Sequence, residues 1–329
     1  MPPFRGRFSV LQPTRRFIIQ KYNLSCVSQS SKSITTVFRS SFSTSQSAAE
    51  PAAPPPPPQR WISDIQARIG RCLCFGCSPG QVERAARVLR AVATEWRHLL
   101  AGSEGFLTGG DEQHHVGGRK GPGRPGLIGH RIAWGDMDSF GHVNNVNYFR
   151  YAESARVNWI SDFAVHVDPK HRKQWTELMT TRSSGLIMRT LKCEYKFPLV
   201  YPDIISVYHK LRFSPNSGGD SDFTTAISPA HDPAAFILDC IIVSHKHRRI
   251  AARLEEDIVV YDYAAGRKAA ALPSFVSDVF RATWAQQQRE TSRSRAQIWD
   301  LIREVEALEK ETWDRQDAVE DMGSAVKTT

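Results

Sequence analysis

The sequence predicts an α+β fold, and three observations lead to this prediction. A short strand, a polar loop and a long helical stretch come in that order between Arg131 and Phe163. Runs rich in Ile, Val, Tyr and Phe, separated by turns, continue to about Tyr263. Helical patterns lie on both sides of this region, before Gly102 and after Pro273. This order of elements is typical of an α+β domain with additional terminal helices.

The first 49 residues have the composition of a mitochondrial transit peptide. They carry seven Arg and Lys and no Asp or Glu, with Ser and apolar residues between the cations. Since the whole chain has a formal net charge of +9, the remainder is close to neutral, and we expect no nucleic-acid partner. We expect residues 1–49 to direct the protein to the mitochondrial matrix; a disordered basic tail is the alternative. No later apolar run approaches the roughly 18 residues that span a bilayer.

Two segments without periodicity are predicted to be irregular. Residues 50–60 contain five consecutive prolines and form an extended spacer that cannot join a packed core. Residues 102–129 are rich in Gly and are predicted to be a flexible insertion.

Residue types that bind metals occur twice outside the central region. Cys72, Cys74 and Cys77 lack a second pair of Cys or His at the spacing of a zinc finger. His114 and His115 lie in the predicted flexible insertion, where a preformed site is hard to build. Neither group therefore indicates a metal site.

A helical extension is predicted over residues 61–101. Ser78, Pro79 and Gln81 form a capping-box signal, with proline at the first helical position. Apolar residues then recur at helical spacing, and Gly102 is placed to end the helix.

The central region contains the predicted strands, and residues 168–181 are predicted to add a short helix. Strands are expected at 186–197, 204–213, 222–228, 235–245 and 251–261, with a hairpin loop at 214–220. In the C-terminal extension over 266–329, an apolar 3-4-3 pattern predicts an amphipathic helix that packs within the molecule or against another subunit, rather than a coiled coil. The residues of this pattern are Ile298, Leu301, Val305 and Leu308.

The stretch from Trp134 to Tyr148 carries the chemistry. It reads WGDMDSFGHVNNVNY, a polar loop that leads into a helix with Asn144 as a candidate N-cap. Asp136, Asp138 and His142 thus gather just before a helix N-terminus. That terminus offers unpaired N–H groups and the positive end of the helix dipole, which can hold a polarised carbonyl or an anion.

On these residues the chain resembles the 4-hydroxybenzoyl-CoA thioesterase-like branch of the hotdog superfamily, in a fungal-type mitochondrial form. Members carry a signature of the type G-D-x-D-x-x-G-H-V-N-N-x-x-Y before a long central helix. The matching residues are Gly135, Asp136, Asp138, Gly141, His142, Val143, Asn144, Asn145 and Tyr148. The resemblance implies a hotdog domain over residues 130–265, in which an antiparallel sheet wraps around the helix of residues 145–163.

The resemblance also implies roles for individual residues. Asp138 matches the catalytic aspartate and would act as nucleophile or general base; an Asx turn or a cap is the structural alternative. His142, Asn145 and Tyr148 would bind the substrate or orient the loop, and Asp136 would fix the turn. Helix N-terminal amides would stabilise the oxyanion.

The implied function is hydrolysis of acyl-CoA in the mitochondrion, without a metal or redox cofactor. The implied assembly is a homodimer or homotetramer with sites between subunits. A non-catalytic hotdog subunit, docked to a mitochondrial assembly through its terminal helices, is the alternative. A dehydratase is disfavoured because His166 and Asp168 lack the surroundings of such a site. Glu153 and Arg156 are expected to form a surface ion pair on the central helix.

Overall fold

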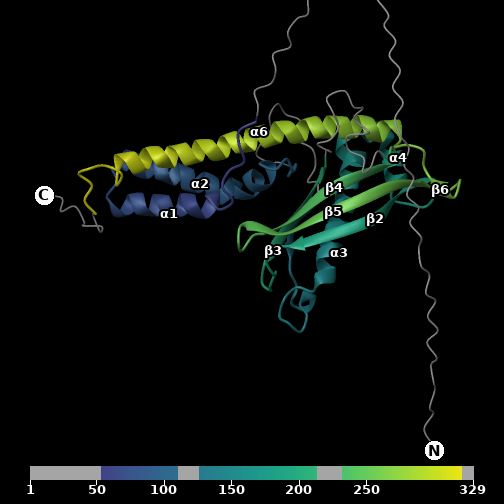
Figure 1. Ribbon diagram of the computed structural model, residues 1–329, viewed down its shortest axis with the longest axis horizontal. Helices are drawn as coiled ribbons and strands as arrows, with labels where there is room; N and C mark the ends of the chain where they lie inside the picture. Colours follow the sequence, from purple (N-terminus) through teal and green to yellow (C-terminus); the bar gives the residue numbers. More distant parts are fainter. Residues whose placement is uncertain (1–52, 110–125, 213–231, 321–329) are drawn as a thin grey trace, which may run out of the picture. The chain divides into compact units, whose positions relative to one another are not determined.

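The computed structural model describes residues 53–109, 126–212 and 232–320. Figure 1 shows these residues as a sheet with the helix of residues 145–162 behind it. The longest helix, residues 274–311, runs along the top of the picture. The leader over 1–49, His114 and His115, the hairpin loop at 214–220 and the strand expected at 222–228 lie outside the described residues.

The sheet is antiparallel, with the strand order β1-β3-β4-β5-β2. Its strands are β1 (Leu127–Arg131), β2 (Ser184–Tyr195), β3 (Ile204–Leu211), β4 (Ala235–Ser244) and β5 (Arg249–Asp262). A short strand β6 (Arg267–Lys268) pairs with the end of β5. Each described strand from β2 to β5 overlaps the segment predicted for it, because β-branched and aromatic runs bounded by turns mark strands well.

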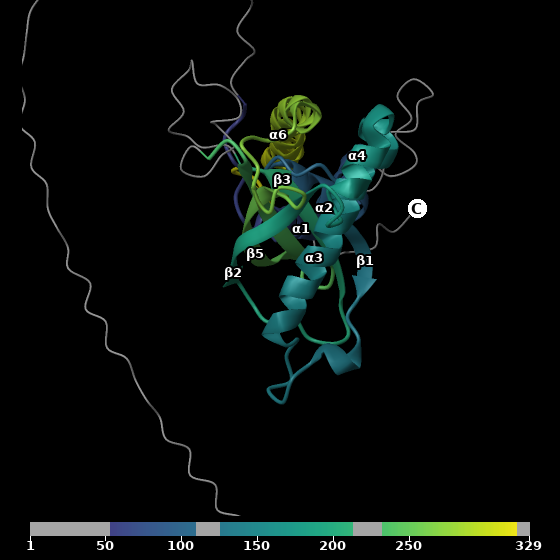
Figure 2. The ribbon, with the colours of Figure 1, turned by 90° about the vertical axis from the view of Figure 1, so that its right-hand side faces the viewer.

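Helix α3 (Asn145–Asp162) lies against the inner face of this sheet, and Figure 2 shows the loop that precedes it at the lower end. Alternate residues of β4, among them Cys240 and Ile242, are buried together with Ala152 and Ala155 of α3. Side chains of a strand point alternately to its two faces, so this alternation defines the inner face. An antiparallel sheet wrapped around a central helix confirms the predicted hotdog fold.

After α3 the chain makes a π-helical turn (Phe163–Val167), a 3-10 turn (Pro169–His171) and helix α4 (Arg172–Glu177). The short helix expected at 168–181 is therefore present. The Asp168 carboxylate is buried and accepts hydrogen bonds from Trp175 Nε1 and His171 Nδ1, at 3.1 and 2.8 Å. Asp168 thus has a structural role.

Between α3 and the sheet lies a buried ionic cluster. Arg156 of α3 contacts the Glu256 carboxylate at 2.8 Å, and His209 Nε2 lies 3.3 Å from the same carboxylate. The surface ion pair expected between Glu153 and Arg156 is wrong, because Arg156 points inward to a carboxylate on β5 instead of along the helix surface.

Three helices form an extension. They are α1 (Trp61–Cys74), α2 (Pro79–Gly102) and α6 (Ser274–Glu311), and all described residues belong to one compact unit. The two N-terminal helices and the C-terminal half of the long helix pack on the outer face of the sheet. Val276 and Phe280, near the start of the long helix, are buried instead with α3 and with Phe236 of the inner face. The capping box predicted at the start of α2 is confirmed, with Ser78 and Gln81 bonded reciprocally. Figure 1 shows α6 running above α1 and α2 and on over the sheet. None of the helices among the described residues is both long and apolar enough to cross a membrane.

The C-terminal half of α6 packs within the molecule. Ile298, Val305 and Leu308 are buried in a cluster with residues of α1 and α2, and with Tyr208 and Ile241 of the outer sheet face. The amphipathic helix predicted from the 3-4-3 pattern is confirmed, and its apolar stripe contacts the same chain.

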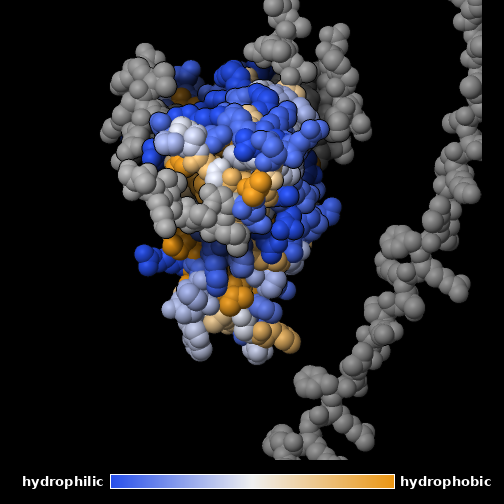
Figure 3. Space-filling view, turned by 90° about the vertical axis from the view of Figure 1, so that its left-hand side faces the viewer, coloured by the Kyte–Doolittle hydropathy of each residue, from blue (hydrophilic) through white to orange (hydrophobic). Residues whose placement is uncertain are grey.

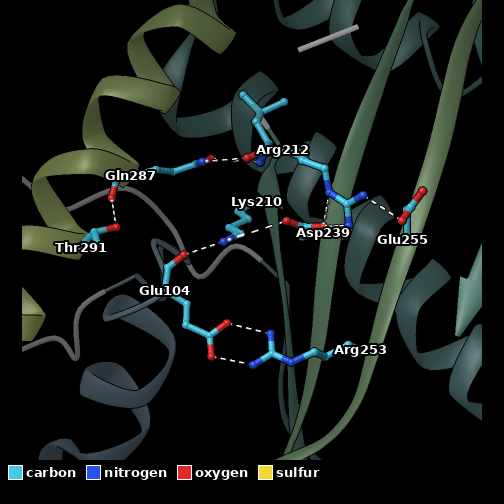
Figure 4. A network of polar contacts seen from close by, with 9 residues as sticks. Glu104, Lys210, Arg212, Asp239, Arg253, Glu255, Gln287 and Thr291 are labelled. Atoms are coloured by element: carbon cyan, nitrogen blue, oxygen red, sulfur yellow. Dashed lines mark hydrogen bonds and ion pairs between the residues drawn. The ribbon is translucent and has the colours of Figure 1, made fainter. Parts of the chain in front are cut away.

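The prediction of a flexible insertion over residues 102–129 is wrong at both ends of the segment. Residues 127–129 belong to β1, and Phe106 is fully buried against the outer sheet face. Figure 4 shows how the segment is fastened: the Glu104 carboxylate receives two hydrogen bonds from Arg253, at 2.6 and 2.7 Å. Lys210 Nζ donates to the Glu104 main-chain oxygen at 2.6 Å, and burial lowers the pKa of this lysine. These contacts fix the end of α2 on the sheet.

The Pro-rich spacer, whose described part begins at residue 53, has no regular secondary structure and runs beside α6. The Pro54 and Pro55 carbonyl oxygens accept hydrogen bonds from Arg295 and from Trp299 Nε1, at 3.1 and 2.9 Å. The spacer therefore stays outside the core, as expected, and still contacts the helical extension.

Candidate active site

The loop between β1 and α3 is held in shape by Asp136. Its carboxylate accepts hydrogen bonds from the Ala133 N–H at 2.8 Å and from the Tyr151 hydroxyl at 2.9 Å. Its main-chain oxygen accepts from Asn144 N–H and from Asn147 Nδ2. Burial and the bond to Asp136 raise the pKa of Tyr151, so this hydroxyl keeps its proton as the donor. The predicted role of Asp136 in fixing the turn agrees with these contacts.

Asp138 lies at the next turn of the same loop, and one of its oxygens is engaged. Asp138 Oδ1 accepts a hydrogen bond from the Phe140 N–H at 2.9 Å, which is the geometry of an Asx turn. The Asp138 N–H donates to the His142 main-chain oxygen at 2.8 Å, and Gly141 has the positive φ of 75° that closes the turn. Asp138 Oδ2 makes no hydrogen bond with the described residues, and the side chain is half-buried. The turn thus holds the carboxylate and leaves one oxygen available for chemistry.

The N-terminus of α3 follows this turn directly. The Asn144 side chain caps the helix by accepting from the Val146 N–H at 3.1 Å, as predicted. The Asn147 N–H donates to the Asn144 main-chain oxygen at 2.9 Å. Among the described residues, no hydrogen bond is found for the Asn145 N–H, at the first helical position. An uncommitted N–H at the positive end of the helix dipole can stabilise a developing oxyanion.

The other predicted site residues differ in exposure. The His142 side chain is exposed and makes no hydrogen bond with the described residues, whereas its main chain braces Asp138. Asn145 is exposed, and its main-chain oxygen accepts from the Tyr195 hydroxyl at 3.5 Å. Tyr148 is only 2% exposed, and its hydroxyl accepts from the Leu199 N–H at 2.9 Å. The structure therefore places Asp138, His142 and Asn145 at the surface and Tyr148 in the core, where it orients the neighbouring loop.

Tyr195 is a site residue that sequence reasoning missed. It contacts Asn145 and packs edge-on against Tyr148, with ring centroids 4.9 Å apart. Burial and the nearby Cys193 raise its pKa to about 12, so the hydroxyl stays protonated at neutral pH. Its position at the end of β2, far from the signature in sequence, gave no signal.

Apolar side chains surround the loop. Figure 3 shows apolar residues among pale polar ones at the lower end of the molecule, where the loop lies. The exposed members at this end are Trp134, Phe140, Val146, Tyr195, Val200 and Tyr201, with Trp134 73% and Phe140 84% exposed. Large exposed apolar groups beside a polar turn are typical of a ligand site or a subunit contact.

A cavity lies away from this loop. It has a volume of about 580 Å³ and opens on the outer sheet face, between Phe106, Lys210 and Arg253. Its charged groups pair with one another, as Figure 4 shows for Arg212 with Asp239 and Glu255. None of the residues that line it belongs to the loop that carries Asp138 or to the N-terminus of α3, so the loop end is the better candidate.

No group of three or more His, Cys, Asp or Glu side chains is placed to hold a metal ion within the described ranges. Cys72 is buried and Cys74 is exposed, and the Cys77 thiol donates to the Cys72 main-chain oxygen at 3.5 Å. Burial raises the pKa of the Cys77 thiol, which disfavours the thiolate that a metal needs.

Residues 132–280 match the family model described as the Thioesterase-like superfamily. No curated protein matches the chain. Among solved structures, a thioesterase from Thermus thermophilus, complexed with coenzyme A and Zn, is 19% identical; the alignment covers 49% of this chain and 97% of that chain, with a TM-score of 0.33.

Two further solved structures align with a similar share of this chain. A 1,4-dihydroxy-2-naphthoyl-CoA thioesterase from Synechocystis is 14% identical, over 47% of this chain and 95% of its own, with a TM-score of 0.34. A DHNA-CoA thioesterase from Staphylococcus aureus is 15% identical, over 55% and 90%, with a TM-score of 0.30. The family match begins just after β1 and ends within α6, leaving α1, α2 and most of α6 outside it. Residues 132–280 thus form a hotdog domain similar to the Thioesterase-like superfamily, to which terminal helices are added.

Proposed function

We propose that the protein is a thioester hydrolase that cleaves acyl-CoA to the free acid and CoA, with Asp138 as nucleophile or general base. The observation that carries the proposal is the half-buried Asp138 carboxylate, whose Oδ2 is uncommitted, in a turn that leads to the N-terminus of α3. The match of residues 132–280 to the Thioesterase-like superfamily supports the same chemistry. The signature from Gly135 to Tyr148 favours the 4-hydroxybenzoyl-CoA thioesterase-like branch, in a fungal-type form.

Two routes use the same groups. In the first, Asp138 Oδ2 attacks the thioester carbonyl, CoA leaves as the thiolate and takes up a proton, and water hydrolyses the resulting mixed anhydride. In the second, Asp138 takes a proton from a water that attacks the carbonyl, the C–S bond then breaks, and CoA leaves as the thiolate and takes up the proton from Asp138. In both routes the Asn145 N–H would stabilise the negative charge on the carbonyl oxygen.

The test is hydrolysis of a panel of acyl-CoA thioesters by the purified protein, followed as release of free thiol. We expect release from at least one member of the panel, with a clear preference among acyl groups. Release from none of them would contradict the proposal.

We also propose that the protein works as a homodimer or homotetramer. β2 pairs with β5, and no other strand among the described residues pairs with its second edge. The inner-face residues Leu186, Met188 and Leu191 on this strand are only partly buried. Such an edge, with half-exposed apolar groups, favours pairing with a second copy. A monomer in sedimentation at micromolar concentration would contradict this.

Location in the mitochondrial matrix is proposed from the leader. The seven cations and the absence of acids in residues 1–49 support import. Deleting residues 1–49 is expected to leave a fluorescently tagged protein in the cytosol, and unchanged mitochondrial location would contradict the proposal.

The second candidate function is a scaffold subunit that docks to a mitochondrial assembly through the terminal helices. The observation that favours it is the extension of α1, α2 and α6, whose apolar cluster includes the outer sheet face and none of the residues of the candidate site. Absence of thiol release, together with co-purification of a stable complex that is lost when surface residues of α1 and α2 are changed, would favour the scaffold.

A further inference from the structure

The hairpin between β4 and β5 presents three cations in four residues. Lys246 and Arg249 are exposed and Arg248 is half-buried. None of the three forms an ion pair with a described residue, and neither does Arg131 at the end of β1. Elsewhere on the sheet, cations such as Arg253 are paired with carboxylates. The hairpin therefore presents three cationic side chains that form no ion pair with a carboxylate of the described chain.

A buried carboxylate fixes the main chain of this hairpin. Asp203 is only 7% exposed, and its Oδ1 accepts from the Lys246 N–H at 3.0 Å. Its Oδ2 accepts from the Ser244 hydroxyl at 2.5 Å, and the Ser244 oxygen accepts from the His247 N–H at 3.1 Å. Since the frame is fixed before any ligand arrives, little backbone entropy is lost on binding.

The same aspartate connects the hairpin to the candidate active site. The Asp203 main-chain oxygen accepts from the N–H of Ile132 at 3.0 Å, and Ile132 lies just ahead of the loop that carries Asp138. Hairpin and loop therefore lie at the same end of the sheet.

Aromatic side chains lie between the hairpin and the helix N-terminus. The Arg249 guanidinium carbon is 4.1 Å from the centre of the Phe197 ring, and the His247 and Phe197 ring centroids are 5.0 Å apart. Phe197 is two residues beyond Tyr195, which is about 7 Å along an extended chain. The Tyr195 hydroxyl in turn donates to Asn145. Tyr195, Phe197 and His247 thus lie between the proposed oxyanion donor and the cations.

We propose that Lys246, Arg248 and Arg249 bind the phosphate groups of the CoA part of the substrate. This inference rests on the proposed function and adds the subsite for the nucleotide end. CoA carries its phosphates at one end of a flexible arm and the thioester at the other. The cations of the hairpin would bind the phosphates, and the Asp138 carboxylate would meet the thioester. Guanidinium groups suit phosphate because their N–H fork matches two phosphate oxygens. The aromatic side chains of Tyr195 and Phe197 would contact the arm between the phosphates and the thioester.

The test compares two substrates that differ only in their phosphate-bearing nucleotide end. The full chain carrying Lys246→Gln, Arg248→Gln and Arg249→Gln is assayed with an acyl-CoA and with the same acyl thioester of pantetheine. Glutamine keeps part of the aliphatic stem and removes the charge. We expect KM for the acyl-CoA to rise at least about tenfold, with kcat nearly unchanged, and KM for the pantetheine thioester to stay the same. Equal changes for both substrates, or no change for either, would overturn the proposal.

The matched control removes the same number of cations elsewhere. Arg87→Gln, Lys173→Gln and Arg303→Gln change side chains that are 59%, 85% and 64% exposed, each in a helix outside the candidate site. We expect this variant to keep both KM values. A rise in KM for the acyl-CoA in the control as large as in the hairpin variant would show a general charge effect and overturn the assignment.

A binding measurement separates this subsite from the hydrolysis itself. Calorimetric titration of the full chain with CoA, and with 3′,5′-ADP as the phosphate-bearing fragment, does not depend on Asp138. Loss of binding in the hairpin variant supports the subsite even if no thioester is hydrolysed. Unchanged CoA binding in that variant, together with loss of binding to phosphatidylglycerol vesicles, would overturn it in favour of a lipid surface.

Discussion

The Arg156 guanidinium lies 2.8 Å from the Glu256 carboxylate, and this ion pair joins α3 to the inner face of the sheet. Glu256 and His209 are fully buried, so no solvent compensates a lost partner. Removing one member of a buried pair leaves an uncompensated charge. We expect Glu256→Gln to lower the free energy of unfolding by about 3–5 kcal/mol, measured by urea denaturation.

The control for this variant is an ion pair on the other face of the same sheet. Lys192 Nζ lies 3.9 Å from the Glu255 carboxylate, and the lysine side chain is 82% exposed. Lys192→Gln is expected to cost less than about 1 kcal/mol, because water screens exposed pairs. Similar losses in the two variants would contradict the special role of burial.

The same cluster predicts a pH dependence of stability. Although burial acts to raise it, His209 and Arg156 together hold the pKa of Glu256 below its ordinary value of 4.5. A carboxylate whose pKa is lower in the folded state stabilises the fold above the unfolded pKa, and this contribution disappears as the pH falls through the folded pKa. The difference in unfolding free energy between the natural chain and Glu256→Gln is thus expected to shrink as the pH falls below about 5. A difference that stays constant down to acid unfolding would contradict this assignment.

Local pattern predicted the elements, and it did not predict the contacts between them. The capping box at Ser78 and the strands after residue 184 follow from short-range periodicity and turn residues, which are readable in sequence. The partner of Arg156 lies 100 residues away on β5, and spacing along one helix cannot identify such a contact. Phe106 was missed because surrounding glycines made its segment look flexible. At the site, the turn made by Asp136 and Asp138 was predictable, whereas the burial of Tyr148 depends on the distant Leu199.

The burial of Phe106 predicts how much unfolding free energy is lost when the contact between the helical extension and the sheet is weakened. Its side chain is fully buried between the end of α2 and the outer sheet face. Phe106→Ala is expected to lower the free energy of unfolding by about 3–5 kcal/mol, since it removes buried surface and leaves a cavity. Phe140→Ala is the matched control, because that ring is 84% exposed, and it is expected to change stability by no more than about 0.5 kcal/mol. A small effect at Phe106 would mean that the extension is not fixed to the sheet as described.

The substitution Tyr148→Phe tests whether the Tyr148 hydroxyl orients the loop or contacts the substrate. Its buried hydroxyl accepts from the Leu199 N–H, and Tyr148→Phe leaves that N–H unsatisfied. We expect a loss of about 1–3 kcal/mol in unfolding free energy with KM for acyl-CoA nearly unchanged. A large rise in KM with unchanged stability would show instead that the hydroxyl contacts substrate.

The substitution Asp138→Asn separates catalysis from the Asx turn. Asparagine retains an oxygen that can accept from the Phe140 N–H, so the turn is expected to survive and the melting temperature to change little. It lacks the negative charge that a nucleophile or a general base needs. We therefore expect thioester hydrolysis to fall by at least about a hundredfold, measured as kcat/KM.

The paired substitution Asp136→Asn decides between the two carboxylates of the loop. Asp136 accepts hydrogen bonds from the Ala133 N–H and the Tyr151 hydroxyl, and a neutral amide weakens both bonds. This variant is expected to lose stability more than chemistry, with a clear fall in melting temperature and a smaller fall in hydrolysis. Activity lost at Asp136 and kept at Asp138 would mean that the two roles are interchanged. Small and equal effects on hydrolysis at both positions would mean that neither carboxylate carries the reaction, and the scaffold function would then be the better interpretation, because the loop would serve only to connect β1 to α3.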